Sequence, residues 1–194
     1  LWQDVAPILH MVDARSTSEG GPRMSFFEVL VVLAYAAFAD APVDVAVVEV
    51  GMGGVWDATN VADGDVSVVA PVAMDHAQWL GDSLVDIASE KAGIIKDGAV
   101  AVVAHQPDAV EPVLAEAARE RGARALWEGE ELEVVDRSPG VGGQLVTLRT
   151  PAATYADVFV PLYGEYQAHN ALLALTAVEA LMADGGEPRA LDGS

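Results

Sequence analysis

Three side chains suited to metal binding or catalysis stand close to predicted secondary-structure ends: Glu49, His76 and Lys91. Glu49 ends an apolar, β-branched segment, and His76 follows a second such segment. In open α/β sheets, ligands bind beyond the carboxyl ends of the strands. If the two strands are neighbours, Glu49 and His76 meet at one sheet edge, where a carboxylate and an imidazole suit a divalent metal.

Each of these residues also has a simpler explanation. Glu49 could pair with an arginine or cap a helix, and a lone histidine is usually hydrogen-bonded in a loop. Lys91 lies late in a predicted helix, where lysine is ordinarily a solvated charge that favours the helix dipole. Its neighbours are small or apolar, however, and a desolvated lysine can act as a nucleophile or be carbamylated. From the residues alone, both explanations stay open.

A glycine-rich stretch follows Glu49, with Gly51, Gly53 and Gly54 ahead of Asp57. Glycine-loop amides can bind phosphate, but the chain has no Gly-x-x-x-x-Gly-Lys-Ser/Thr pattern, so this signal is weak. It also has no nucleophilic serine motif and no zinc pattern. The residue patterns therefore indicate an α/β domain with a candidate metal or nucleotide site.

Strands and helices alternate through the first two thirds of the chain. Apolar runs predict strands over residues 44–50, 65–73, 99–104 and 123–127, and helical spacing predicts segments at 2–12, 25–39, 83–93 and 108–121. Ser25, with Glu28 three residues later, has the pattern of a capping box. The alternation favours a mostly parallel sheet with helices on both faces.

The pattern changes after residue 130. Residues 145–148 and 158–162 flank a turn at 150–152, which predicts an antiparallel hairpin. A strong helical pattern then covers residues 167–183. The predicted fold class is α/β, with a β-hairpin added to the parallel sheet.

Composition excludes several classes of protein. Thirty acidic residues against ten basic ones give a formal charge of −20, which argues against non-specific nucleic-acid binding. A bound anion would need compensation from Mg²⁺, glycine-loop amides or a few cations. The chain has no cysteine and no apolar run long enough to span a membrane, so we expect a cytoplasmic protein.

Several short motifs occur in an order that resembles the folylpolyglutamate synthase/dihydrofolate synthase family of the Mur ligase superfamily. They are Ser25-Phe26-Phe27-Glu28, Glu49-Val50-Gly51-Met52-Gly53-Gly54, Asp57-Ala58-Thr59-Asn60-Val61, Met74-Asp75-His76 with Trp79-Leu80-Gly81, Glu90-Lys91-Ala92-Gly93-Ile94-Ile95-Lys96, and Gly164-Glu165-Tyr166-Gln167 with Asn170-Ala171. Each motif is short, but the ordered set is specific. The resemblance runs from about Met11 to Leu181.

The resemblance implies a P-loop NTPase-like fold and an ATP-dependent ligase. Such enzymes join L-glutamate to dihydropteroate or to a tetrahydrofolate (poly)glutamate through an acyl phosphate. The implied partners are ATP, one or two Mg²⁺ ions and the small-molecule substrates, without nucleic acid or membrane, and relatives suggest a monomer. Two alternatives are another Mur-type ligase with a UDP-muramyl or polyglutamate substrate, and a non-catalytic nucleotide-binding domain.

The resemblance also implies roles for individual residues. Glu49, His76 and a carbamylated Lys91 match the metal-binding and catalytic residues, and Asn170 matches an adenine contact. The residues that match the pterin or folate site are Ser25, Phe26, Phe27, Glu28, Trp56, Asp57 and Ala58. Tyr166 stands where the family commonly has histidine.

On the same resemblance, residues 1–184 correspond to a central ATP-binding domain and residues 185–194 to a linker toward a glutamate-ligase domain. The phosphate-binding loop of the family would precede Leu1, so the domain is expected to be incomplete at its N-terminus. We therefore expect the 194-residue chain alone to be inactive.

Overall fold

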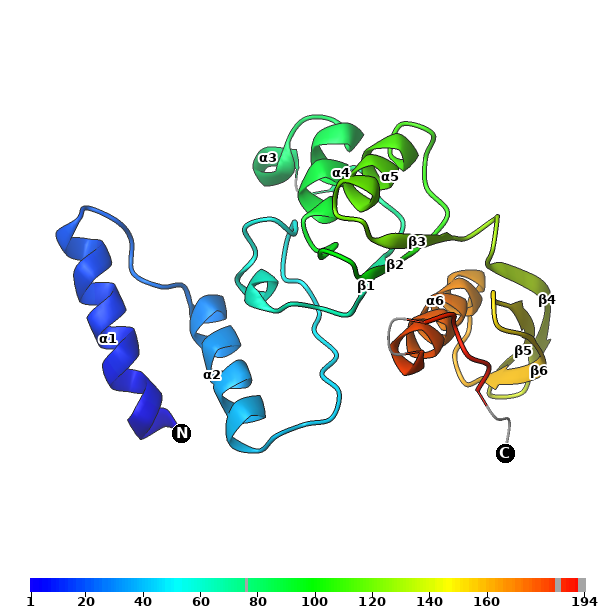
Figure 1. The fold of residues 1–194 in the computed structure, drawn as a ribbon, viewed down its shortest axis with the longest axis horizontal. Helices are drawn as coiled ribbons and strands as arrows, with labels where there is room; N and C mark the ends of the chain where they lie inside the picture. The colour runs from blue at the N-terminus through cyan, green and yellow to red at the C-terminus, as the bar shows by residue number, and fades with distance from the viewer. Residues whose placement is uncertain (76, 184–185, 192–194) are drawn as a thin grey trace. The chain divides into compact units, whose positions relative to one another are not determined.

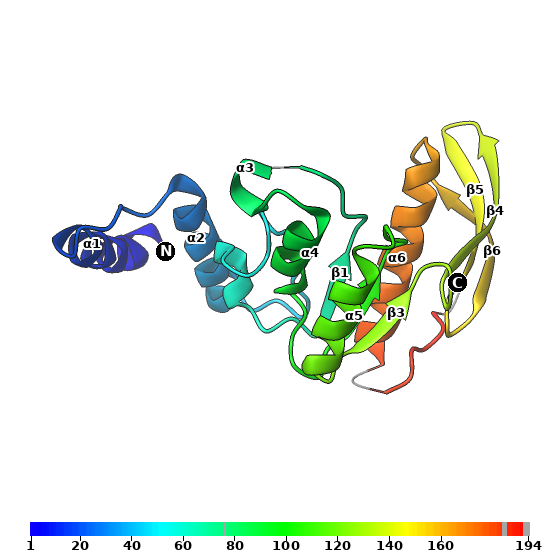
Figure 2. The same ribbon diagram turned by 90° about the horizontal axis from the view of Figure 1, so that it is seen from above.

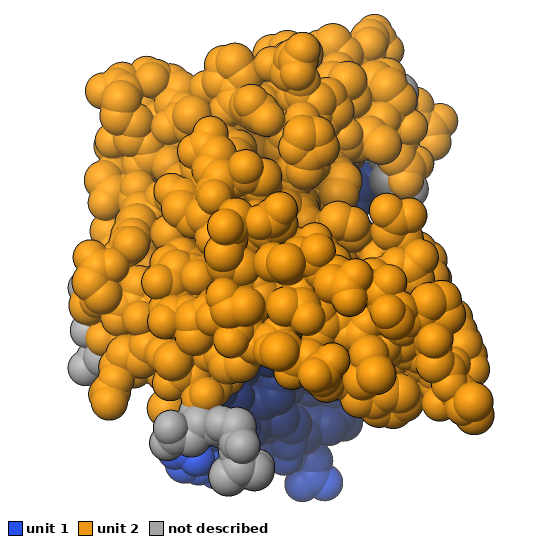
Figure 3. Space-filling view, turned by 90° about the vertical axis from the view of Figure 1, so that its right-hand side faces the viewer, with its two compact units in different colours: residues 1–62 blue, residues 63–194 orange. Residues whose placement is uncertain are grey.

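The computed structural model describes residues 1–75, 77–183 and 186–191. The chain divides into two compact units, residues 1–62 and residues 63–194, which Figure 3 colours separately. His76, one of the three candidate chemical residues, lies outside the described residues.

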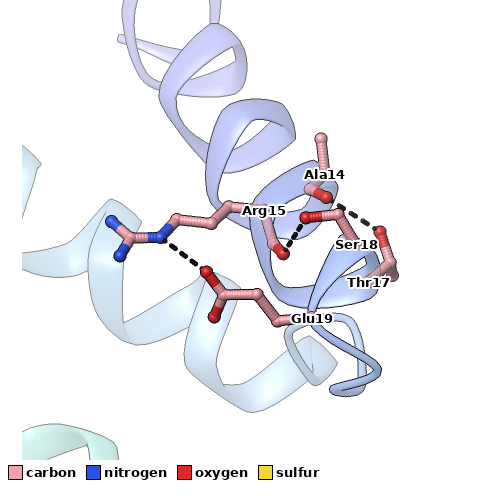
Figure 4. Close-up of polar contacts among 5 residues, drawn as sticks. All are labelled: Ala14, Arg15, Thr17, Ser18 and Glu19. Carbon is pink, nitrogen blue, oxygen red and sulfur yellow. Dashed lines mark hydrogen bonds and ion pairs between the residues drawn. The ribbon is translucent and has the colours of Figure 1, made fainter.

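The first unit contains the helices α1 (Trp2–Ser18) and α2 (Phe26–Asp40) and the short 3₁₀ helix η1 (Ala58–Val61) (Figure 1). Helix α1 runs six residues beyond the predicted end at residue 12, because its last turn is held by side chains. Ser18 Oγ donates to the Arg15 carbonyl at 2.7 Å, and Arg15 Nε contacts Glu19 Oε1 at 3.2 Å (Figure 4). Hydroxyl groups that bond one turn back allow a Ser/Thr-rich segment to stay helical.

Helix α2 begins as the sequence predicts. The Ser25 amide donates to Glu28 Oε2 at 2.6 Å, and the Glu28 amide donates to Ser25 Oγ at 3.2 Å. These reciprocal bonds satisfy two amides that a helix start otherwise leaves without partners, so the predicted capping box is confirmed.

The strand predicted over residues 44–50 is wrong. This segment belongs to no strand, and Val47 is 94% exposed. A β-branched run becomes a strand only when another strand satisfies its backbone groups, and no described residue pairs with this one. The strand pairing that would have brought Glu49 to the sheet edge beside the His76 strand is therefore not formed in the described part of the chain.

The second unit contains the predicted parallel sheet. Its order is β1 (Val66–Val69), β2 (Val100–Val103) and β3 (Arg124–Trp127), and Val102 lies opposite Val68 and Leu126. Helices α4 (Leu84–Ala92) and α5 (Glu111–Glu120) cover one face, and α6 (Glu165–Met182) packs on the other (Figure 2). A short helix, α3 (Ala77–Leu80), precedes α4. The prediction of helices on both faces is confirmed.

An antiparallel sheet follows, in the order β4 (Glu133–Gly140), β5 (Gly143–Arg149) and β6 (Thr154–Val160). The predicted hairpin corresponds to β5 and β6. Strand β4 was not predicted, because its residues are mostly exposed and include Asp136, Pro139 and Gly140, residue types that are depleted in strands. Helix α6 lies between the two sheets (Figure 2). The shared core comprises Val102, Ala104, Leu126, Leu132, Val146, Leu148, Val160, Ala168, Leu172 and Leu173.

The start of α6 is fixed by Gln144, a buried residue of β5. Its Nε2 donates to the carbonyls of Leu162 and Gly164, each at 3.0 Å. Gly164 has a φ of 104°, and a Cβ there would lie 2.6 Å from Cε1 of Tyr166. Only glycine fits this turn without strain, so the first residues of α6 are held in one position.

Candidate functional site

The carboxyl edge of the parallel sheet is braced by polar side chains. Gln106, just beyond β2, is 1% exposed. Its Oε1 accepts from the Val72 amide at 2.9 Å, and its Nε2 donates to the Ala70 carbonyl at 3.1 Å. The amide therefore fixes residues 70–72, which follow β1 in the chain.

Glu128, immediately after β3, uses both carboxylate oxygens. Oε2 accepts from the His105 amide at 3.0 Å, and Oε1 contacts Nδ1 of His169 on α6. The Glu128 side chain is 8% exposed and that of His169 is 42% exposed. The nearly buried Glu128 carboxylate thus links the residues that follow β2 to the second turn of α6.

Asn170, the candidate adenine contact, is exposed next to His169 on α6. Its Nδ2 donates to Gln167 Oε1 at 3.3 Å. This bond is long, and Asn170 is exposed, so the amide can exchange it for a bond to a ligand.

Lys91 lies in the last turn of α4 and is half-buried. The turn that follows is held from two sides. Arg121 Nη1 donates to the carbonyls of Ala92 at 3.2 Å and of Ile95, and Ser67 Oγ donates to the Ile94 carbonyl at 2.7 Å. These bonds satisfy carbonyls at the helix end and place Lys91 on a rigid support.

Glu90, beside Lys91, has a buried Oε2 without a hydrogen-bond partner among the described residues. An unsatisfied buried carboxylate oxygen is the kind of atom that a cation or a ligand donor completes. No three His, Cys, Asp or Glu side chains within the described residues gather into a metal site. By their chemistry, a carboxylate, an imidazole and a lysine carbamate nevertheless suit Mg²⁺.

The glycine-rich segment of the first unit is organised by Asp57. Its Oδ2 accepts from the Met52 amide at 2.9 Å, and its Oδ1 accepts from the Thr59 amide at 2.9 Å and the Thr59 hydroxyl at 2.6 Å. Burial alone would raise the pKa of Asp57, but these bonds outweigh it and lower the pKa below its usual value. The carboxylate is thus kept charged and directed into its own loop.

Tyr35 adds a second support to this loop, since its hydroxyl donates to the Thr59 carbonyl at 2.8 Å. Burial and the nearby negative charge of Asp57 raise the pKa of Tyr35. The hydroxyl therefore keeps its proton and its donor role.

The other candidate substrate residues differ in what they can offer a ligand. Ser25 and Glu28 are engaged in the capping box, whereas Phe26 is 79% exposed and Trp56 is 53% exposed. A Cβ at Gly51 would lie 2.5 Å from the Phe27 ring, so Phe27 packs directly on the glycine turn. Among the candidate substrate residues, Phe26 and Trp56 therefore present the most exposed rings, while Ala58 is half-buried at the start of η1.

The described structure thus places Lys91 and Asn170 on well-supported elements of the second unit, and Glu49 in an exposed segment of the first. Sequence reasoning missed four supporting residues: Gln106, Arg121, Glu128 and His169. Their partners are 23 to 41 residues away in the chain, as Arg121 with Ile95, Gln106 with Val72, and His169 with Glu128 illustrate. The one available signal was position, because Gln106 and Glu128 each follow an apolar run.

Comparison with known proteins identifies the class. The model of the Mur ligase middle domain matches residues 17–178, and the chain belongs to this family. It is 48% identical over 202 aligned residues to dihydrofolate synthase/folylpolyglutamate synthase of Mycobacterium tuberculosis, covering 99% of this chain and 41% of the relative. It is also 33% identical to the protein of that name from Bacillus subtilis, covering 89% of this chain and 40% of the relative.

Solved structures give the same result. Mycobacterium tuberculosis folylpolyglutamate synthase, complexed with ADP and AMPPCP, matches with a TM-score of 0.90 at 45% identity, over 99% of this chain and 43% of that one. An FPGS–AMPPCP–folate complex matches with a TM-score of 0.84 at 32% identity, over 93% of this chain and 44% of that one. The chain spans about two-fifths of the length of these relatives. Among the described residues, none of the helices has the length and hydropathy of a membrane-spanning segment.

Proposed function

We propose that the chain is the central part of an ATP- and Mg²⁺-dependent ligase that adds L-glutamate to dihydropteroate, to a tetrahydrofolate (poly)glutamate, or to both. The observation that carries the proposal is the 48% identity to a dihydrofolate synthase/folylpolyglutamate synthase over 99% of this chain. Residues 1–184 would form the central ATP-binding domain, and residues 185–194 would lead toward a glutamate-ligase domain.

The proposed reaction has two steps. The acceptor carboxylate attacks the γ-phosphorus of ATP, which forms an acyl phosphate and releases ADP. The glutamate amine then attacks the acyl carbon, so that the amide bond forms, phosphate leaves and the amine loses its proton to solvent. A free carboxylate is a poor electrophile, and phosphorylation supplies the leaving group that the amide bond requires.

Glu49, His76 and Lys91 would hold Mg²⁺, with Lys91 as its carbamate. Carbamylation replaces a cation by a carboxylate-like anion, which suits a hard, oxygen-seeking metal. When bound, Mg²⁺ neutralises charge on the transferred phosphoryl group. The bonds from Arg121 and Ser67 to the turn after Lys91 support this role, since a metal ligand must be held in place.

Asn170 would contact the adenine of ATP from the second turn of α6. Its exposure, its weak bond to Gln167 and the fixed start of α6 support this assignment. The relative solved with ADP and AMPPCP has the same fold over 99% of this chain.

The pterin or folate would lie on the aromatic residues of the first unit, and the capping box and glycine turn would position them. Phe26 and Trp56 would supply exposed rings for stacking. Ser25, Glu28 and Asp57 would act mainly through the backbone that they fix, because their polar atoms already have partners. Phe27 and Ala58 would complete the wall of the site.

The test is phosphate release from ATP by the full product of the gene, with L-glutamate and one acceptor at a time. The acceptors are dihydropteroate, tetrahydrofolate and a UDP-muramyl compound. Release that requires glutamate and a pteridine supports the proposal and tells which activities are present. Release with the muramyl acceptor alone would indicate another Mur-type ligase, with a UDP-muramyl substrate. No release with any acceptor would favour a non-catalytic nucleotide-binding domain.

A further inference from the structure

The contact between Glu128 and His169 has no role in the function proposed above. It joins residues 41 positions apart, at the carboxyl edge of the parallel sheet. Glu128 is nearly buried and both its oxygens are bonded, so the carboxylate cannot turn toward another partner. A buried carboxylate is costly unless it is paired. The contact with the imidazole of His169 supplies such a pairing and holds the ring in place.

The geometry fixes which atom of His169 remains available. Nδ1 is engaged by the buried Glu128, while 42% of the side chain is exposed. Nε2 lies on the opposite edge of the ring and has no hydrogen-bond partner among the described residues. A carboxylate on one ring nitrogen fixes the tautomer and orientation with which the other nitrogen meets a ligand.

We infer that His169 is a further nucleotide-binding residue, oriented by Glu128 so that Nε2 contacts the base of a bound adenine nucleotide. The inference rests on the proposed function, because it uses the assignment of the adjacent Asn170 to adenine. His169 would bind the nucleotide directly, and Glu128 would be a positioning residue that acts through it.

The charges around the pair favour the base over the phosphates. Glu128 carries a negative charge, and Glu165 lies one helical turn before His169 on α6. An anionic phosphate next to two carboxylates would be repelled, whereas an uncharged base would not be. The tautomer with its proton on Nδ1, facing Glu128, leaves Nε2 as an acceptor. Nε2 can therefore exchange a hydrogen bond from water for one from the amino group of adenine.

Two variants of His169 separate ligand contact from structural support. The amide of glutamine reaches about as far as Nε2, and the shorter amide of asparagine reaches about as far as Nδ1. If Nε2 contacts the base, His169→Gln should bind ADP within about twofold of the parent protein. His169→Asn should bind it about threefold to tenfold more weakly, the loss of one ordinary hydrogen bond. The reverse order would overturn the inference, because it would show that only the contact with Glu128 matters.

The experiment is calorimetric titration of the full gene product with ADP and, separately, with pyrophosphate. Pyrophosphate affinity should not change in either His169 variant, because it lacks the base. His10→Gln, on α1 in the other unit, is the matched control and should bind ADP like the parent. Equal weakening of both ligands would assign His169 to the phosphates and refute the inference.

Nitrogen-15 NMR of the histidine rings tests the role of Glu128. ADP should shift the Nε2 resonance of His169, and Glu128→Gln should change the tautomer before ADP is added and weaken ADP binding. An Nε2 resonance that ADP leaves unmoved would overturn the inference even if the variants bind less ADP. If the parent protein binds no ADP at all, the proposed nucleotide function itself fails, and the present inference fails with it.

Discussion

Asp57 accepts hydrogen bonds from both the amide and the hydroxyl of Thr59, at 2.9 and 2.6 Å. Together with the bond from the Met52 amide, these contacts make Asp57 the residue that holds the glycine turn in place. The carboxylate bonds to groups of its own loop. In a nearby substrate site it would therefore support the loop and would not contact the ligand.

Replacing Asp57 by Asn should destabilise the chain by about 1–3 kcal/mol at pH 7, the usual cost of breaking a buried polar network. The pKa of Asp57 is lowered in the folded state, so its contribution to stability is fully present above the unfolded pKa of ~3.9 and is lost as the pH falls through the folded pKa. Urea unfolding between pH 7 and pH 3 measures both effects.

Asp44→Asn is the control for this prediction, because Asp44 is an exposed acidic residue of the same unit. Parent and Asp57→Asn should converge in stability toward pH 3, while Asp44→Asn should follow the parent throughout. If the free energies of unfolding of the parent and Asp57→Asn differed by the same amount at every pH, the charge of Asp57 would not be the source of its contribution.

Gly164→Ala should destabilise the second unit by about 1–3 kcal/mol, since it combines a φ of 104° with a Cβ placed 2.6 Å from the Tyr166 ring. Gly98→Ala isolates the backbone term, because Gly98 has a φ of 70° and nothing within 4 Å of its Cβ position. Thermal unfolding of both variants gives the comparison. Equal losses of stability in the two variants would show that the Tyr166 ring moves aside for the added methyl group.

Tyr155→Phe should cost about 1 kcal/mol at neutral pH, because the Tyr155 hydroxyl lies 2.5 Å from Oε1 of the buried Glu179 and accepts from the Leu191 amide at 2.7 Å. Burial and the bond to Glu179 raise the pKa of Tyr155. Its contribution to stability is therefore fully present below the unfolded pKa of ~10 and disappears as the pH rises through the folded pKa.

Unfolding measured from pH 7 to pH 12 should show the gap between parent and Tyr155→Phe closing at the alkaline end. Tyr163→Phe serves as the comparison, since Tyr163 is 65% exposed and its hydroxyl accepts a single bond from the Gly142 amide. This control should lose less stability at neutral pH. A larger loss for Tyr163 would mean that burial of the Tyr155 network adds little.

Lys91→Ala should abolish ATP-dependent amide formation by the full gene product while the far-UV circular dichroism spectrum stays that of the parent. The reason is the proposed carbamate, which alanine cannot form. Lys96→Ala, in the loop beyond α4, should keep most of the activity. Retained turnover in Lys91→Ala would refute the carbamate, whatever the acceptor.

Local patterns predicted much of the fold and less of the candidate site. The alternation that contains β2, α5 and β3 depends on contiguous apolar runs, and the cap at Ser25 depends on a residue three positions away; both kinds of signal are local. The segment 44–50 failed because its strand needs a partner elsewhere, which composition does not reveal. Glu128 and His169 could not be paired in advance, since their contact requires β3 and α6 to be in place first.

Helix α6 lies between two sheets, so both the polarity of its residues and their register along the helix are constrained. One residue inserted before Leu172 would rotate everything upstream by about 100° and turn His169 and Asn170 away from their present direction. The turn between β4 and β5 has the opposite property, because Val141 at its tip is 100% exposed. In evolutionary terms, insertions and deletions should accumulate at that turn and be purged from α6, where one extra residue disturbs both sheets and the candidate nucleotide contacts together.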